Sequence, residues 1–161
     1  SPQIEEVNLH RIISEVVQTY ATETRAEVSI DGVTDDLTVF ADPGQLRQLV
    51  SNLVKNALEA VAEDGTVSIH ADPVVKNEVR FCRIQIEDDG PGIPIETQAK
   101  IFDPYMTTKR KGTGLGLAIV QRIVFDHHGQ IWFETQRDVG TTFYVDLPRE
   151  PADAHRERGA S

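Results

Sequence analysis

Cysteine, aromatic residues and basic residues are all scarce in this sequence of 161 residues. It has one cysteine, Cys82, and 6% aromatic residues. A single cysteine excludes an internal disulfide, which suits a reducing compartment. No apolar run approaches the ~20 residues of a membrane-spanning helix, and no secretory signal pattern opens the chain. The 16 Lys and Arg against 26 Asp and Glu leave a net charge of −10, which argues against broad nucleic-acid binding. A polyanion would therefore bind only at a local site.

Helical periodicity and capping residues predict two helices in the first part of the chain. Apolar residues recur at helical spacing over residues 8–24, and Asn8 is a candidate N-cap. The sequence DPGQ at 42–45 combines a capping Asp, a Pro at the first helical position and a Gln three residues after the cap. A second helix should therefore run from there to about Ala62.

Strand patterns follow each of these helices. The stretches AEVSIDG and LTVFAD flank the turn-rich GVTDD, and DGTVSIHAD should pair with the longer EVRFCRIQIEDDG. Residues 93–113 lack a sustained period, which predicts a long ordered loop or lid. A third helix is expected from about Gly114 to His127, before the strands GQIWFETQ and GTTFYVDLP. Strands mixed with three helices predict an α+β sandwich, a sheet with helices on one face, over residues 1–148. The polar residues 149–161 are expected to be a disordered tail.

A glycine-rich stretch, GTGLGL at 112–117, lies where the third helix should begin. Such a turn offers free backbone N–H groups and the positive end of the helix dipole, which together suit phosphate. Lys109, Arg110 and Lys111 precede it. The stretch lacks the Gly-Lys-Ser/Thr of a Walker motif and the preceding strand of a Rossmann fingerprint. The alternative interpretation is a flexible basic loop.

A second candidate site is EDDGPGIP at 87–94. Asp88 ends a predicted strand, and Gly90 and Gly92 permit a turn that most residues resist. A carboxylate there could accept a hydrogen bond from an amino group, such as the exocyclic amine of adenine. The alternative is a tight Asp-Gly turn, with Asp89 facing solvent.

A third candidate site is on the helix expected at 43–62, where Asn52 and Asn56 lie one turn apart on one face. Asparagine is a poor helix former, because its side chain competes for backbone hydrogen bonds. A hard cation such as Mg²⁺, which takes oxygen ligands beside substrate phosphates, would explain two of them in a helix interior. The alternative is a solvated polar stripe.

Taken in order, these sites resemble the ATP-binding domain shared by sensor histidine kinases, type II topoisomerases, Hsp90 chaperones and MutL repair proteins. The segments that carry the resemblance span about residues 8–148: NLVKNALEA is similar to the N box, DDGPGIP to the G1 box, IFDPYMTTK to the F box, GTGLGL to the G2 box and GTTF to a last box. The resemblance implies a Bergerat-type two-layer sandwich: a mixed sheet, three main helices on one face and an ATP lid. The histidine kinase branch fits best, and TTKRKGTGLGLAIV is similar to the nitrogen-regulation sensor kinases of bacteria.

One position distinguishes a kinase from an ATPase. The hydrolytic relatives carry a Glu four residues before the metal-binding Asn, where it serves as general base for water. This sequence has Asn52 there, and an amide cannot accept a proton at neutral pH. The resemblance therefore implies a site that holds ATP for another nucleophile.

The resemblance assigns roles to residues that match its motifs. Asn56 would bind Mg²⁺, Asp88 would accept from the adenine amine, Phe102 would anchor the lid, and Thr141 would line the adenine pocket through water. The other expected ATP-binding residues are Asn52, Gly90, Gly92, Lys109, Gly112, Thr113, Gly114, Leu115 and Gly116. Many sensor kinases have a Lys three residues after the metal-binding Asn, where this chain has Glu59, so Lys55 is the candidate cation on that helix.

The phosphoacceptor histidine of a sensor kinase is not found among the five histidines. None has Glu or Asp next to it and Pro four residues later; His127 and His128 close a predicted helix, where a cationic ring would favour the dipole. We therefore expect the catalytic half of a longer kinase, which would donate the γ-phosphoryl of ATP to a histidine of separate dimerisation helices and act with a response regulator. It would be cytoplasmic, with no nucleic-acid or direct membrane contact. The alternatives are a serine protein kinase of the anti-sigma-factor type and a regulatory nucleotide-binding module that transfers no phosphate.

Overall fold

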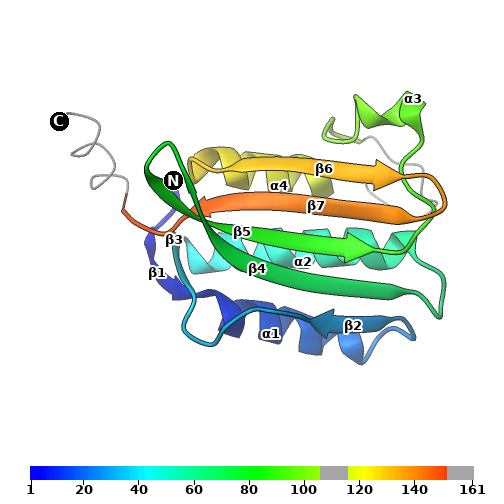
Figure 1. Ribbon diagram of the computed structural model, residues 1–161, viewed down its shortest axis with the longest axis horizontal. Coiled ribbons are helices and arrows are strands. Elements are labelled where there is room, and N and C mark those ends of the chain that lie inside the picture. The colour runs from blue at the N-terminus through cyan, green and yellow to red at the C-terminus, as the bar shows by residue number, and fades with distance from the viewer. Residues whose placement is uncertain (106–115, 152–161) are drawn as a thin grey trace.

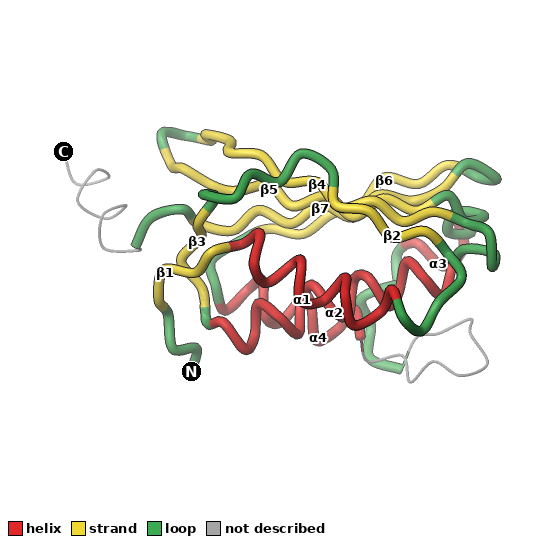
Figure 2. The backbone as a smooth tube through the Cα atoms, turned by 90° about the horizontal axis from the view of Figure 1, so that it is seen from below, coloured by secondary structure: helices red, strands yellow, loops and turns green. Residues whose placement is uncertain are grey.

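The computed structural model describes residues 1–105 and 116–151, which form two layers, a sheet and a layer of helices (Figures 1 and 2). The helices α1 (Leu9–Ala21), α2 (Pro43–Ala60) and α4 (Gly116–Asp126) cover one face, and the short α3 (Ile95–Gln98) follows the strand β5. The strands are β1 (Glu5–Asn8), β2 (Glu27–Ile30), β3 (Thr38–Ala41), β4 (Thr66–Lys76), β5 (Val79–Asp88), β6 (Gln130–Gln136) and β7 (Gly140–Pro148). The predicted α+β sandwich with three main helices on one face is confirmed.

The main sheet has the strand order β2-β4-β5-β7-β6. β2 and β4 pair in parallel, whereas the other neighbours in this order are antiparallel, so the sheet is mixed as predicted. The predicted pairing of β4 with β5 is confirmed over ten residue pairs. The strand β1 was not predicted, and it forms a separate antiparallel pair with β3. The two short strands β2 and β3 therefore lie in different sheets, although they are neighbours in the sequence.

Both predicted helix caps are present. The Asn8 side chain accepts a hydrogen bond from the N–H of Arg11, and the Asp42 side chain accepts one from Gln45 at the start of α2. Backbone N–H groups of Gln3 and Gln45 lower the pKa of Asp42, because they stabilise its charged form. α1 ends three residues earlier than predicted and α2 two residues earlier, which is ordinary for helix ends set by capping.

The core lies between the sheet and the helices. On β5, alternate residues Cys82, Ile84 and Ile86 are buried against the helices, and Leu49 and Leu53 of α2 are equally buried. This alternation follows from the two-residue period of a strand. Among the described residues, no helix is both long and apolar enough to cross a membrane.

Part of the predicted tail contacts the sheet. The N–H of Arg149 donates to the carbonyl of Arg80, and the Glu150 side chain is buried and accepts from the N–H of Arg80. Residues 152–161 lie outside the described part of the chain. A domain boundary after residue 148 stays a prediction.

Candidate functional site

Asp88 is a carboxylate in a row of buried apolar side chains. The buried positions of β5 alternate through Ile84 and Ile86 to Asp88, whose side chain is 4% exposed on the face covered by helices. Its Oδ1 accepts a hydrogen bond of 2.9 Å from the N–H of Gly90. Burying a carboxylate where Val or Ile would pack costs free energy unless donors meet it. Asp88 therefore puts a polar group where an apolar side chain would pack better. A destabilising polar residue of this kind is typical of a binding site.

The turn after β5 leans on the hairpin between β6 and β7. Gly92 has φ +86°, and a Cβ there would lie 2.8 Å from the carbonyl oxygen of Gln136, so only glycine fits. The N–H of Asp138 donates to the carbonyl of Pro91. Asp89, predicted as a solvent-facing turn residue, is exposed but also accepts from the N–H and hydroxyl of Thr66. The turn is therefore bonded to the start of β4 on one side and to the β6–β7 hairpin on the other. It lies at the end of the sheet that is far from the N-terminus (Figure 1).

Thr141 lies directly beside Asp88. The two residues are partners in the β5–β7 register, both face the helices, and Thr141 is 5% exposed. The next strand contributes Thr135, whose hydroxyl oxygen lies 2.8 Å from that of Thr141 and accepts from the N–H of Ile93 at 2.9 Å. The structure therefore brings the predicted adenine-side residues Asp88 and Thr141 together.

Thr135 was missed as a site residue. The sequence did contain a signal for it, since Ile131, Phe133 and Thr135 alternate along β6 and so point to one face. A threonine in a helix-facing row that is otherwise apolar is the same kind of signal that Asp88 gives on β5.

The two asparagines of α2 are half-buried on one face of the helix. The amide Nδ2 of Asn52 donates to the carbonyl of Gly116, 3.4 Å away, and so joins α2 to the first residue of α4. Asn56 lies one turn further along α2. Lys55 is exposed, and its predicted contact with phosphate stays a prediction. The alternative interpretation, a solvated polar stripe, does not describe Asn52, because its amide donates a hydrogen bond to another helix.

Phe102 anchors the segment after α3 to the sheet. Its ring lies 6.3 Å from that of Phe133 and 6.4 Å from that of Phe143, in tilted and edge-on geometries that aromatic pairs favour. The predicted ATP-binding residues Lys109, Gly112, Thr113, Gly114 and Leu115 lie outside the described residues, and Gly116 begins α4.

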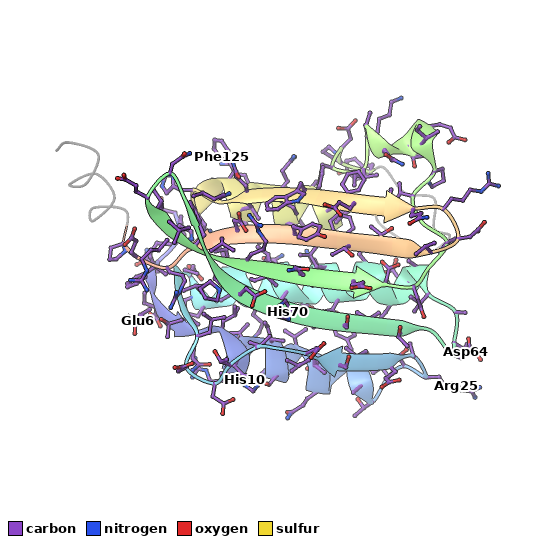
Figure 3. All side chains as sticks on the ribbon, in the orientation of Figure 1. Glu6, His10, Arg25, Asp64, His70 and Phe125 are labelled. Carbon is purple, nitrogen blue, oxygen red and sulfur yellow. The ribbon has the colours of Figure 1, made fainter. Side chains whose placement is uncertain are left out.

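Two histidines of the described residues, His127 and His70, have side-chain hydrogen bonds that fit structural roles. His127 is 3% exposed; its Nδ1 bonds to the carbonyl of Ile123, and its Nε2 accepts from the N–H of Asp42. The ring of His127 therefore joins the end of α4 to the residue that caps α2. His70 lies on the open face of β4 and bonds to Asp31 and Asp72 (Figure 3).

Comparison with known proteins identifies relatives over most of the chain. The family described as "Histidine kinase-, DNA gyrase B-, and HSP90-like ATPase" matches residues 41–151. Sporulation kinase A of Bacillus subtilis (strain 168) is 32% identical over 149 residues, which is 91% of this chain and 24% of that protein. The signal transduction histidine-protein kinase AtoS of Escherichia coli (strain K12) is 36% identical over 153 residues, 92% of this chain and 24% of that protein. The chain thus spans about a quarter of the length of either relative.

Solved structures share the fold. The catalytic domain of histidine kinase ThkA, in a nucleotide-free form, has a TM-score of 0.80 and 34% identity, covering 91% of this chain and 96% of that one. Full-length ShkA in complex with AMPPNP has a TM-score of 0.80 and 27% identity, covering 94% and 32%. ThkA in complex with the response regulator protein TrrA has a TM-score of 0.75 and 34% identity, covering 92% and 42%.

Proposed function

Because the chain belongs to the family of histidine kinase-, DNA gyrase B- and HSP90-like ATPases, as a histidine kinase catalytic domain, we propose that it binds Mg·ATP and presents the γ-phosphoryl group to a histidine of a separate domain. The observation that carries this proposal is the buried Asp88 at the end of β5, beside Gly90. A buried carboxylate at a sheet end can accept a further hydrogen bond from a neutral amino group. The 6-amino group of adenine is such a donor.

The proposal also gives roles to the neighbouring residues. Gly90 and Gly92 shape the turn against which the purine would stack, and Thr141 supplies a hydroxyl beside Asp88. Phe102 fixes the segment that leads to the lid, where Lys109 and the backbone from Gly112 to Gly116 would meet the phosphates.

Magnesium fits the residues of α2. Mg²⁺ is usually held by one or two protein oxygens together with water and substrate phosphates. The Asn56 amide offers such an oxygen, and the described residues contain no cluster of three His, Cys, Asp or Glu that would hold a metal alone. Bound beside the phosphates, the ion would neutralise their charge during transfer.

Kinase rather than ATPase activity is supported by Asn52. At the position where hydrolytic relatives have a basic carboxylate, this chain has an amide whose nitrogen donates to Gly116. An amide cannot take a proton from water. Phosphoryl transfer then depends on positioning and charge stabilisation, with the attacking imidazole supplied by the other domain.

The relatives support a two-component context. AtoS and ThkA are named histidine kinases, and one solved neighbour is ThkA in complex with a response regulator protein. We propose dimerisation helices of the same full-length kinase and a response regulator as partners, a cytoplasmic location, and a place in the nitrogen-regulation-like subgroup on the stretch TTKRKGTGLGLAIV. The relatives' names do not favour the anti-sigma-factor type of serine kinase or a module without transfer.

Calorimetric titration with a non-hydrolysable ATP analogue tests the proposal, with and without Mg²⁺. Asp88→Asn should weaken binding by about tenfold or more, because an amide presents a donor where an acceptor is needed. Glu87→Gln is the matched control, since Glu87 is the next residue on β5 but is exposed on the other face. Equal affinities of wild type and Asp88→Asn would refute the adenine assignment. Phosphate transferred to the full-length kinase's acceptor histidine should be lost in acid, whereas phosphoserine would survive.

A further inference from the structure

We propose that Thr135 is a positioning residue for base recognition: its hydroxyl orients that of Thr141, so that the Thr141 proton faces the base. The inference rests on the proposed function, because it concerns how the same pocket distinguishes adenine. Thr135 belongs to none of the motifs that resemble the family.

Three side chains form one row across three neighbouring strands. Thr135 on β6 pairs with Thr141 on β7, and Thr141 pairs with Asp88 on β5. All three are on the helix-facing side of the sheet, where Thr141 and Asp88 are 5% and 4% exposed. Thr135 occupies the outer end of the row, because β6 is the edge strand and Thr141 lies between it and Asp88.

The number of hydrogens available to Thr135 indicates which hydroxyl donates and which accepts along the row. Thr135 Oγ1 accepts the N–H of Ile93 at 2.9 Å, and lies 2.8 Å from Thr141 Oγ1 but 3.4 Å from the carbonyl of Gly140. If Thr135 gives its single proton along the 2.8 Å contact, the chain of donors runs from Ile93 through Thr135 to Thr141. Each hydroxyl that accepts becomes a better donor, so this order is cooperative. The reverse order leaves the Thr135 proton only the long contact with Gly140.

This direction leaves the Thr141 proton free to donate toward the pocket, directly or through a water. The row then presents an acceptor, Asp88, beside a donor, Thr141. The amino edge of adenine offers the complement, since the 6-amino group donates and the neighbouring ring nitrogen, N1 or N7, accepts. Guanine has a carbonyl oxygen in place of the amine and would leave Asp88 facing another acceptor.

Thr135 also holds the turn that forms one wall of the pocket. Ile93 donates its N–H to Thr135 and accepts at its carbonyl from the side-chain amide of Gln98, 3.0 Å away. Removing the Thr135 hydroxyl would therefore release the turn as well as reorient Thr141. The two effects can be separated, because only the second depends on the acceptor nitrogen of the base.

The test is titration of ATP, 1-deaza-ATP and 7-deaza-ATP, with Mg²⁺, into wild type, Thr135→Val and the matched control Thr135→Ser. Thr135→Val should weaken ATP binding by about fivefold to tenfold, and Thr135→Ser should restore it to within about twofold of wild type. The wild type should already bind one of the two deaza analogues weakly. Thr135→Val should reduce the affinity for that analogue by a markedly smaller factor than it reduces the affinity for ATP. That analogue identifies the nitrogen.

An unchanged affinity for ATP in Thr135→Val, or an equal loss for ATP and both analogues, would overturn the proposal. The unfolding midpoint of each variant verifies folding. Should Thr135→Val fail to fold, Thr135→Ala takes its place, since it removes the same hydroxyl and should give the same dependence on the analogue. A folded wild type that binds none of the three nucleotides would instead contradict the proposed function.

Discussion

The backbone of Gly140 lies directly against the carbonyl of Asp88: a Cβ at position 140 would be 2.0 Å from that oxygen. Gly140 also has φ +149°, a conformation that side chains rarely adopt. The start of β7 and the end of β5 therefore meet without an intervening side chain. This contact fixes Asp88 and Thr141 side by side.

Gly140→Ala should lower the free energy of unfolding by roughly 2 kcal/mol or more, because it combines overpacking with backbone strain. Urea denaturation measures the change. Gly44→Ala is the matched control: a Cβ at Gly44 meets only Asp42 Oδ1 at 3.4 Å, in the first turn of α2. That variant should be unchanged or more stable by up to about 1 kcal/mol. If the two variants changed the free energy of unfolding equally, the close approach of Gly140 to Asp88 would not be what destabilises Gly140→Ala.

Asn56→Ala should weaken binding of Mg·ATP far more than binding of metal-free ATP. The reason is that the proposed role of the amide is to ligate the ion. Titration with and without Mg²⁺ gives both affinities. Gln48→Ala, an exposed change on the same helix, should alter neither. Equal losses of the two affinities in Asn56→Ala would show that Asn56 acts through the fold.

The contacts of His70 predict a pH-dependent stability. The pKa of His70 is raised above its usual 6.5, mainly because the carbonyl of Asp31 bonds to the ring. Partial burial lowers this pKa, and the Asp72 carboxylate raises it further. The stabilisation is therefore complete below pH 6.5 and is lost as the pH rises through the higher pKa of the folded state.

Urea unfolding of wild type and His70→Gln between about pH 6 and pH 8 measures this contribution. The stability difference between the two proteins should shrink as the pH rises. Asp72→Asn, which keeps the imidazole but removes one partner, should show a smaller pH dependence than wild type. A difference that grows with pH would contradict the assignment.

Asp146 is a fully buried carboxylate on the open face of the sheet. Arg83 donates two hydrogen bonds to it at 2.9 and 3.0 Å, and Lys76 lies 2.6 Å away. Asp146→Asn should lower the free energy of unfolding by about 2–4 kcal/mol, since it leaves two cations without their counter-charge. Arg83→Met should lower the free energy of unfolding by less in the Asp146→Asn variant than in wild type, because that variant has already lost the ion pair. Nucleotide affinity should stay within about twofold of wild type, because Asp146 faces away from the candidate site; a large loss would contradict that separation.

The local features of this fold could be predicted because adjacent residues determine them. The caps of α1 and α2 depend on Asn8, Asp42 and the few residues after them, and the β4–β5 hairpin joins strands that are neighbours in sequence. The strand β1 could not be found in this way. It is four residues long, and its partner β3 follows far along the chain, with Glu5 opposite Ala41.

The candidate site divides in the same way. Motif order pointed to Asp88, Asn52 and Thr141, and the structure places Asp88 beside Thr141 and bonds Asn52 to Gly116. The role of Thr135 depends on which strands are neighbours, and strand periodicity alone does not supply that order.

The helices, most strands and the order of the motifs could be predicted from the sequence, because periodicity and capping act within a few residues. Only the folded chain shows the order of the sheet, the contact of His127 with Asp42 at the start of α2 and the row Thr135–Thr141–Asp88. Periodicity sets only which side of an element is apolar. Which element covers that side, and which polar groups then meet, is settled only when the whole core packs.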